Sequence, residues 1–303
     1  MYERETIMSD FRPERLKDLK PKHDFLIGID SDGCVFDTME IKQKECFAPV
    51  TIGVWNLQAV SKYAREAIEF VNLYSRWRGC NRFIALIREL DLLAERPEAV
   101  RRGFKLPEFG PLRTWVEAGG TLSNATLKEI AAQTGHPSFE QALTWSNLIN
   151  QRIAEIVHGV PPFTGVRQCL AKMATEADLI VVSQTPGEAL EREWEEHGID
   201  HYPAVIAGQE MGTKTDHLKL AAGGKYPADH VLMIGDALGD LKAAQGAGAL
   251  FFPVNPGREE ESWDRLYREG IDRFLEGKFS GTYEKELIDE FERLLPETPP
   301  WKK

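Results

Sequence analysis

The sequence predicts an α/β fold: a doubly wound parallel sheet of Rossmann-like type, interrupted by an inserted helical domain. Short apolar runs rich in β-branched residues indicate five strands, at Phe25–Ile29, Asp178–Ser183, Ala204–Ala207, Val231–Gly235 and Ala249–Pro253. Segments with helical patterning separate the last four, as in the βαβ units of a parallel sheet. Roughly 140 residues lie between the first two strands, far more than a crossover helix needs.

Helices flank the later strands in the order that this fold requires. Helical patterning is present at Gln168–Ala177, Glu188–His197 and Asp216–Ala222. From about Asn255 the chain continues with two amphipathic helical stretches and a Pro-rich, charged tail, Pro296 to Lys303. Ligands of open α/β sheets bind beyond the carboxyl ends of the strands, so we expect the site there.

The insertion itself reads as a helical domain. Apolar residues recur at helical spacing in two groups, and two further segments show the same pattern: Leu57, Val60, Ala64, Ile68 and Val71; Phe83, Leu86, Ile87 and Leu90; Thr126–Ala132; Phe139–Val157. Pro161, Pro162 and Gly165 then break the helical pattern. We therefore assign residues 39–160 to the inserted domain, and residues 1–38 and 161–303 to a discontinuous core domain.

Charge and hydropathy exclude several classes of partner. The chain has 37 basic and 48 acidic residues, and its net charge of −11 argues against nucleic acid or an anionic membrane. The apolar runs are far shorter than the roughly 18 residues of a membrane-spanning helix. The start of the chain, Met1 to Asp24, lacks the apolar stretch of a secretory signal. We expect a cytoplasmic protein, and the sequence says nothing of its oligomeric state.

The first candidate site residues follow the first strand, in the run Asp30-Ser31-Asp32-Gly33. Because residues i and i+2 of a strand lie on one side, both carboxylates can address one point, and Gly33 allows a sharp turn. Like charges this close raise one pKa unless a cation intervenes. One carboxylate can then act as nucleophile and metal ligand, and the other as general acid. An acidic turn with no catalytic role is the alternative.

Each later strand adds one polar element at its end or just beyond it. Ser183 closes the second strand and could bind a phosphoryl oxygen, or simply cap a helix. Lys214 follows the third strand and could neutralise a carboxylate and a phosphate, although an isolated loop lysine is usually solvated. Asp236 and Asp240 follow the fourth strand at a spacing that suits a hard divalent cation. No packing requirement would place these four elements together.

With these four elements in this order, the chain resembles the haloacid dehalogenase-like hydrolase superfamily, over residues 25–37 and about 161–255. The resemblance implies that Asp30 is the nucleophile, Asp32 the general acid and base, and Ser183 and Lys214 ligands of the phosphoryl group. It also implies Mg²⁺ as the cofactor, held by Asp30, the backbone carbonyl of Asp32, and Asp236. Asp240 would contact these ligands rather than the ion itself, or would reach the ion through a water molecule. Residues 39–160 would form a mobile cap.

Within that superfamily, the aspartate at position 32 narrows the choice of reaction. Dehalogenases and phosphonatases of the family lack an aspartate at this position, so the resemblance implies phosphoryl transfer. A phosphatase acting on a monoester of a small metabolite is favoured. A phosphotransferase or phosphomutase is the alternative. A phosphoacceptor signalling module is a further alternative, but such a module has no reason to insert about 120 residues after its first acidic motif.

Substrate choice is expected to depend on the inserted domain. Its densest basic run contains Arg76, Arg78 and Arg82 together with Trp77, between two helical patterns. The guanidinium groups could bind a second anionic group of the substrate, and Trp77 could cover an apolar or sugar face. The alternative is an exposed turn between helices, whose arginines pair with Glu66 or Glu69.

Overall fold

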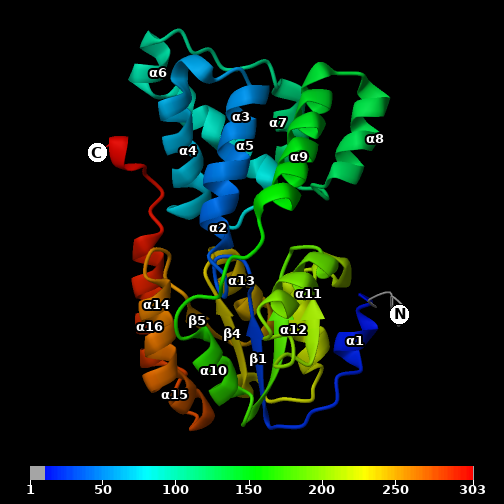
Figure 1. The fold of residues 1–303 in the computed structure, drawn as a ribbon, viewed down its shortest axis with the longest axis vertical. Coiled ribbons are helices and arrows are strands. Elements are labelled where there is room, and N and C mark those ends of the chain that lie inside the picture. Colours follow the sequence, from blue (N-terminus) through cyan, green and yellow to red (C-terminus); the bar gives the residue numbers. More distant parts are fainter. Residues whose placement is uncertain (1–10, 303) are drawn as a thin grey trace. The chain divides into compact units, whose positions relative to one another are not determined.

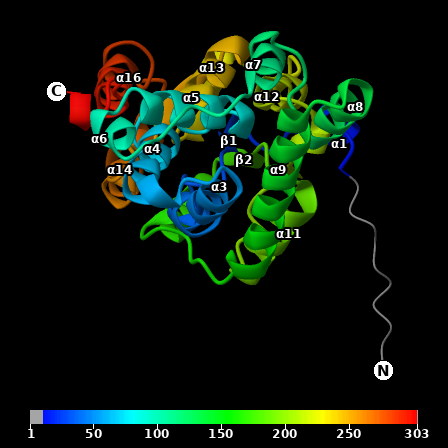
Figure 2. The ribbon, with the colours of Figure 1, turned by 90° about the horizontal axis from the view of Figure 1, so that it is seen from above.

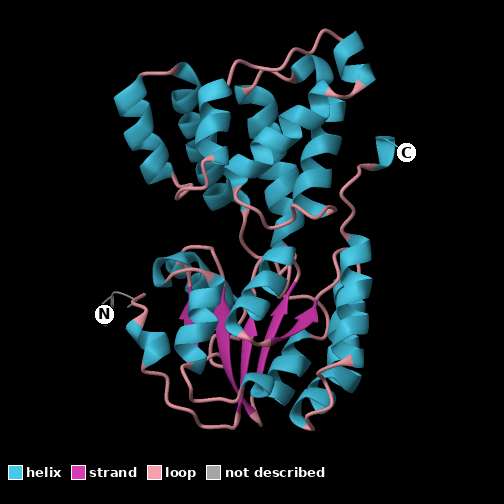
Figure 3. Ribbon diagram, turned by 180° about the vertical axis from the view of Figure 1, so that it is seen from behind, coloured by secondary structure: helices cyan, strands magenta, loops and turns pink. Residues whose placement is uncertain are grey.

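The computed structural model describes residues 11–302 in two compact units. The sheet unit contains the described residues up to Asp37 together with Gly159–Arg293, and the helical unit contains Thr38–His158 together with the chain from Leu294 onward. Figure 3 shows that the strands all lie in the sheet unit. The first ten residues of the predicted core segment, and Lys303, lie outside the described residues. Within residues 11–302, no helix is long and apolar enough to cross a membrane.

The sheet has five parallel strands in the order β3-β2-β1-β4-β5. Their bounds are Phe25–Ile29 for β1, Ala177–Val182 for β2, Val205–Ala207 for β3, Val231–Gly235 for β4 and Leu250–Pro253 for β5. Each strand lies within one residue of its predicted bounds. β1 is the central strand, and its side chains are almost entirely buried because helices cover both faces of the sheet. The predicted fold class, a doubly wound parallel sheet with a helical insertion, is confirmed.

Among the described residues, one helix of the sheet unit precedes β1, four lie between consecutive strands, and three follow β5 (Figure 1). They are α1 (Glu14–Lys17), α10 (Val166–Met173), α11 (Gly187–Glu196), α12 (Lys214–Ala222), α13 (Leu238–Ala247), α14 (Glu259–Arg265), α15 (Ile271–Leu275) and α16 (Thr282–Leu294). Two 3₁₀ turns (Gln209–Met211, Ala228–His230) and a π-helical turn (Leu266–Gly270) complete the described part of the sheet unit. A further 3₁₀ turn, Pro300–Lys302, belongs to the helical unit. α16 runs beside the edge strand β5, where Glu284 accepts a hydrogen bond from the backbone N–H of Phe251 at 2.9 Å. This contact pairs a backbone group that an edge strand would otherwise expose.

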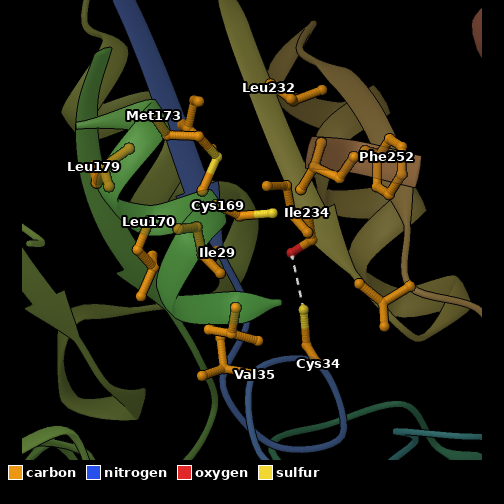
Figure 4. Close-up of a cluster of buried hydrophobic side chains, with 14 of the residues drawn as sticks. Ile29, Cys34, Val35, Cys169, Leu170, Met173, Leu179, Leu232, Ile234 and Phe252 are labelled. Atoms are coloured by element: carbon orange, nitrogen blue, oxygen red, sulfur yellow. Dashed lines mark hydrogen bonds between the residues drawn. The ribbon is translucent and has the colours of Figure 1, made fainter. Parts of the chain in front are cut away.

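One face of the sheet packs on α10, α11, α14 and α15 in a continuous apolar core. Figure 4 shows part of it, where Cys169, Leu170 and Met173 of α10 lie against side chains of the strands. The same cluster includes Cys34 and Val35, which follow β1. The loop after β1 is therefore part of the apolar core of the sheet unit.

The opposite face packs on α12 through a contact that requires a glycine in β1. A Cβ atom added to Gly28 would lie 2.7 Å from Cδ2 of Leu218 in α12 and 3.0 Å from a methyl group of Val182. The absence of a side chain lets α12 approach β1 closely. Because Lys214 is the first residue of α12, this close packing brings its side chain near the end of β1.

The helical unit contains no strand within its described residues. Its helices are α2 (Thr38–Ile41), a π-helical segment (Lys42–Phe47), α3 (Ala48–Val54), a 3₁₀ turn (Gln58–Val60), α4 (Ser61–Leu73), α5 (Arg82–Ala94), α6 (Pro97–Arg101), α7 (Gly110–Glu117), α8 (Asn124–Thr134) and α9 (Pro137–Ile156). α8 packs along α9, and α4 along α5 (Figure 2). Buried aromatic residues, among them Phe83 and Trp145, join α5 and α9 in one apolar core.

The last residues of the chain differ from the sequence-based domain assignment. From Leu294 they belong to the helical unit, whereas the sequence places them with the core domain. The ring of Trp301 lies 5.6 Å from that of Phe70 in α4, and the guanidinium group of Arg96 lies 4.6 Å from the ring centroid of Trp301. Arg76 pairs with Glu297 at 2.9 Å. These aromatic and charged contacts hold the tail on α4 and α5, and periodicity within the tail carries no signal for them.

Candidate active site

The loop after β1 places Asp30 and Asp32 at the carboxyl edge of the sheet. The backbone N–H of Asp30 still pairs with Ile234 of β4 at 3.0 Å, which holds Asp30 at the end of the strand. Gly33 then adopts a φ of 75°, a left-handed conformation that favours glycine. The carbonyl of Ser31 accepts hydrogen bonds from Val35 and Phe36, which closes a tight turn. The predicted role of Gly33 in a sharp turn agrees with this geometry.

Two buried tryptophans hold the same loop through hydrogen bonds from their indole N–H groups. The indole N–H of Trp263 donates to the carbonyl oxygen of Cys34 at 2.9 Å, and that of Trp194 donates to the hydroxyl of Ser31 at 3.1 Å. Ser31 is buried between the two aspartates, and its side chain reaches the sheet-covering helix α11. The carboxylates on either side of Ser31 are consequently attached to a rigid segment of backbone.

Lys214 lies between two carboxylates. Its Nζ atom is 2.7 Å from Oδ2 of Asp30 and 2.6 Å from Oδ1 of Asp240. Thr213 caps α12 by accepting a hydrogen bond from the backbone N–H of Asp216, which starts the helix at Lys214. The side chain of Lys214 is only 17% exposed, so this lysine is not a solvated loop residue.

The turn after β4 is built around the carboxylate of Asp240. Oδ2 of Asp240 accepts hydrogen bonds from the backbone N–H groups of Asp236, at 3.1 Å, and Ala237, at 3.0 Å. A Cβ atom on Gly235 would lie 2.5 Å from Cβ, Cγ and Oδ2 of Asp240. Gly235 therefore makes room for the carboxylate that orders this turn and also pairs with Lys214.

Electrostatic effects at this edge of the sheet are strong and opposed. Burial raises the pKa of Asp30 well above its ordinary value, and the carboxylates of Asp240 and Asp236 add to this effect while Lys214 opposes it. Burial alone would lower the pKa of Lys214, but Asp240 and Asp30 raise it well above its ordinary value. Lys214 is therefore a cation whose charge is maintained by two carboxylates.

The three buried carboxylates fit a divalent cation. Oxygen atoms of Asp30, Asp236 and Asp240 all lie within 4.8 Å of one another. A purely oxygen donor set is what Mg²⁺ prefers, and three carboxylates with one lysine leave negative charge for a cation to neutralise. The carboxylate of Asp32 is not in this group, and a metal contact through the backbone carbonyl of Asp32 stays a prediction.

Ser183 and the next residues form the second half of the site. The hydroxyl oxygen of Ser183, which follows β2, accepts a hydrogen bond from the backbone N–H of Thr185 at 3.2 Å. Pro186, not Ser183, is the residue that precedes α11, so Ser183 does not cap this helix. Because its oxygen accepts a bond inside the loop, the hydroxyl proton of Ser183 can be donated to a ligand.

Thr185 is a site residue that the sequence analysis missed. Its hydroxyl donates to Oδ2 of Asp32 at 2.7 Å. The run Ser183-Gln184-Thr185-Pro186 places a second hydroxyl two residues beyond Ser183, and this spacing is the only sequence signal for it. Which carboxylate Thr185 reaches is decided by the pairing of β1 with β2.

The three arginines of the predicted substrate-binding run have different surroundings in the helical unit. Arg78 is buried and donates to the carbonyl oxygen of Leu73 at 3.1 Å. Arg82 donates to the Ser146 hydroxyl at 3.0 Å and to Asn150 at 2.7 Å. Arg76 is the most exposed of the three, and its partner is Glu297 rather than Glu66 or Glu69.

Trp77, the aromatic residue of this run, also contacts its neighbours in the helical unit. Its ring lies 4.4 Å from the guanidinium group of Arg88 and 6.3 Å from the ring of Phe70. These contacts pack Trp77 between α4 and α5. Substrate binding by the run stays a prediction.

The fold and the site together define a class of protein: an α/β enzyme with an acidic, lysine-paired centre at the carboxyl ends of its strands. The family model described as "Haloacid dehalogenase-like hydrolase" matches residues 102–254, which is half of the chain. The chain therefore belongs to the haloacid dehalogenase-like hydrolases, and the predicted family is confirmed. The match contains Ser183, Lys214, Asp236 and Asp240; Asp30 and Asp32 precede it.

Solved structures of the same family resemble the chain at low identity. A haloacid dehalogenase-like hydrolase from Streptococcus pneumoniae is 13% identical, with a TM-score of 0.45 over 80% of this chain and 90% of that one. A proposed phosphoglycolate phosphatase from Lactobacillus delbrueckii subsp. bulgaricus is 15% identical, with a TM-score of 0.49 over 86% and 100%. The proposed hydrolase YfnB from Bacillus subtilis, bound to magnesium, is 13% identical, with a TM-score of 0.43 over 82% and 100%. Comparison with curated proteins found no match.

Proposed function

We propose that this protein is a Mg²⁺-dependent phosphatase that cleaves a phosphate monoester of a small metabolite through an aspartyl-phosphate on Asp30. One observation carries the proposal. A buried carboxylate, Asp30, pairs with a partly buried lysine, Lys214, within a group of three carboxylates, while Asp32 stands outside that group and accepts a hydrogen bond from Thr185. The two aspartates of one motif thus have two environments, as a nucleophile and a proton donor require.

In the proposed reaction a carboxylate oxygen of Asp30 attacks phosphorus, and the bond between phosphorus and the ester oxygen breaks. Asp32 donates its proton to the departing oxygen and then takes a proton from the water that hydrolyses the aspartyl-phosphate. Lys214 and the hydroxyl of Ser183 bind oxygens of the phosphoryl group and compensate their charge. Asp240 holds Lys214 in place at 2.6 Å.

Asp30, Asp236 and the backbone carbonyl of Asp32 are the groups proposed to hold Mg²⁺, with Asp240 behind them. When bound, the ion would neutralise negative charge on the phosphoryl group and the carboxylates around it. An activity that depends on Mg²⁺ is therefore expected. Chelation should abolish turnover and added Mg²⁺ should restore it, whereas full activity in excess chelator would refute a role for the metal.

The substrate is proposed to carry a second anionic or polar group, bound by the arginine run of the helical unit. Among Arg76, Arg78 and Arg82, we assign this contact first to Arg76. It is the most exposed of the three residues, with 50% of its side chain accessible, and its partner, Glu297, is itself 62% exposed. An exposed ion pair contributes little to stability and can exchange its carboxylate for that of a ligand at small cost.

The experiment that tests the proposed function is hydrolysis of p-nitrophenyl phosphate by the wild type, Asp30→Asn and Asp229→Asn. Asp229 is an exposed aspartate of the same unit and serves as the matched control. We expect activity in the wild type and the control and only background in Asp30→Asn, because no neighbour can replace the nucleophile. The acid-quenched wild type should also gain the mass of one phosphoryl group. More than a few per cent of wild-type turnover in Asp30→Asn would contradict the assignment.

A further inference from the structure

Asp32 is attached to the rest of the site through a side-chain hydrogen bond between two segments far apart in the sequence. Thr185, in the loop between β2 and α11, donates its hydroxyl proton to Oδ2 of Asp32 at 2.7 Å. The two residues are 153 positions apart, so this contact exists only because β1 and β2 are neighbours in the sheet. Both side chains are partly buried, and water competes less for the bond than at a fully exposed site.

The backbone of Thr185 is itself fixed on both sides of the residue. Its N–H donates to the hydroxyl of Ser183 at 3.2 Å, and its carbonyl oxygen accepts from the backbone N–H of Gln209 at 3.1 Å. Pro186 follows with a restricted φ. The backbone N–H of Gly187 then donates to the carboxylate of Glu210 at 3.0 Å. The hydroxyl of Thr185 therefore projects from a segment held by hydrogen bonds and not from a free loop.

The neighbouring Gly208 makes this segment difficult to displace. A Cβ atom on Gly208 would lie 2.5 Å from the backbone nitrogen of Gly187 and 2.8 Å from its Cα. The loop after β2 thus packs directly, backbone against backbone, on the loop after β3. A group attached here keeps its position more precisely than one on a solvated loop.

We infer that Thr185 is a positioning residue that orients the carboxyl group of Asp32 for proton transfer to the leaving group. This inference rests on the proposed function. Because Oδ2 accepts a hydrogen bond from the Thr185 hydroxyl, the proton that Asp32 gives to the ester oxygen is carried by Oδ1. The hydrogen bond also restricts rotation of the carboxyl group, so that Oδ1 is held in the orientation needed for proton transfer to the ester oxygen. Thr185 neither gains nor loses a proton in the step.

The consequence is an effect that depends on the leaving group. A substrate with a basic leaving oxygen needs the proton from Asp32 in the transition state, whereas p-nitrophenolate leaves without it. Loss of the Thr185 hydroxyl should therefore slow the first kind of substrate more than the second. A merely structural role would slow both equally, because nucleophile and phosphate site would be displaced together.

The test compares Thr185→Val, Thr185→Ser and wild type on phenyl phosphate and p-nitrophenyl phosphate, which differ little in size. Thr185→Val removes the hydroxyl at nearly constant shape, and Thr185→Ser keeps it. We expect Thr185→Val to lower kcat on phenyl phosphate about tenfold with little change in KM, and to lower it less than about threefold on p-nitrophenyl phosphate. Thr185→Ser should stay near wild type on both. Thr175→Val is the matched control, because the Thr175 hydroxyl bonds only to the nearby carbonyl of Lys172 among the contacts of the described chain.

A second measurement uses Asp32→Asn as background. There Thr185→Val should cause no further loss on phenyl phosphate, since the group it orients is already unable to donate its proton. Thr185→Ala, measured alongside with the same expectation, covers the case in which valine prevents folding. Equal losses on both substrates, a Ser variant as impaired as Val, or a full additional loss in the Asp32→Asn background would overturn the positioning role. A wild type inactive on both aryl phosphates would overturn the proposed function as well.

Discussion

The buried carboxyl group of Glu89 should make the stability of the helical unit depend on pH. Glu89 lies on α5 and is only 4% exposed. Its Oε1 atom accepts a hydrogen bond from the side-chain amide of Asn72 on α4 at 2.6 Å, and its Oε2 atom is buried with no hydrogen-bond partner among the described residues. Burial raises the pKa of Glu89 from 4.5 to about 7, although the Asn72 hydrogen bond lowers it in part.

The magnitude follows from this difference in pKa. Below pH 4.5 the group is protonated in both the folded and the unfolded chain and contributes no pH dependence. Between pH 4.5 and about 7 the folded protein binds a proton that the unfolded chain has released, so the free energy of unfolding falls as pH rises. At about 1.4 kcal/mol for each pH unit, the complete loss above pH 7 is about 3 kcal/mol.

Glu89→Gln removes the ionisation and keeps the shape of the side chain and the oxygen that accepts from Asn72. We expect the variant to be more stable than wild type at pH 8, and this advantage to exceed that at pH 5 by about 2–3 kcal/mol. Hydrogen exchange of backbone amides in α4 and α5 measures the free energy of opening for this unit alone.

The matched control is Glu129→Gln, an exposed glutamate of α8 in the same unit. It should change the stability at neither pH, because its carboxylate stays in water in the folded protein. An advantage of Glu89→Gln that is the same at pH 5 and pH 8 would refute the reasoning, since it would show that Glu89 has the same pKa in both states.

Three further changes test other parts of the molecule. Gly235→Ala should lower phosphatase activity at least tenfold, because the added Cβ would displace Asp240, while circular dichroism should show that the fold is retained. The control is Gly239→Ala, whose Cβ would meet no atom within 4 Å and which should leave the activity unchanged. Trp301→Ala should destabilise the helical unit by about 1–3 kcal/mol in hydrogen exchange, and unchanged protection of α4 would contradict the packing of the tail. Arg76→Ala should raise KM at least tenfold on the preferred phosphorylated metabolite but not on p-nitrophenyl phosphate; an unaltered substrate preference would place specificity elsewhere in residues 39–160.

Much of the sheet unit was predictable because its signals are local. Five runs of β-branched and apolar residues marked the strands to within one residue, since a buried parallel strand needs apolar side chains on both faces. Chain order then placed Asp30, Ser183, Lys214 and Asp236 together, because the carboxyl ends of parallel strands share one edge of the sheet. The helical nature of the insertion followed from periodicity in the same way.

The partners of these residues were decided by tertiary structure. Sequence placed Asp240 near a cation, but its bond to Lys214 depends on how closely α12 and α13 pack. The contact between Thr185 and Asp32 required β1 and β2 to be neighbours in register. Such contacts join residues far apart in the chain, and no local pattern encodes their distance.

The surroundings of the charged residues in the helical unit show the same limit. In the sequence, Arg76, Arg78 and Arg82 form one basic run. In the structure Arg78 is buried, Arg82 donates hydrogen bonds to α9, and Arg76 forms an ion pair with Glu297. Composition and spacing determine which residues carry charge and which prefer a helix or a strand. The burial of a particular side chain, and with it the pKa of Glu89 or the partner of Arg76, depends on which distant segments cover it, and only the folded chain determines that.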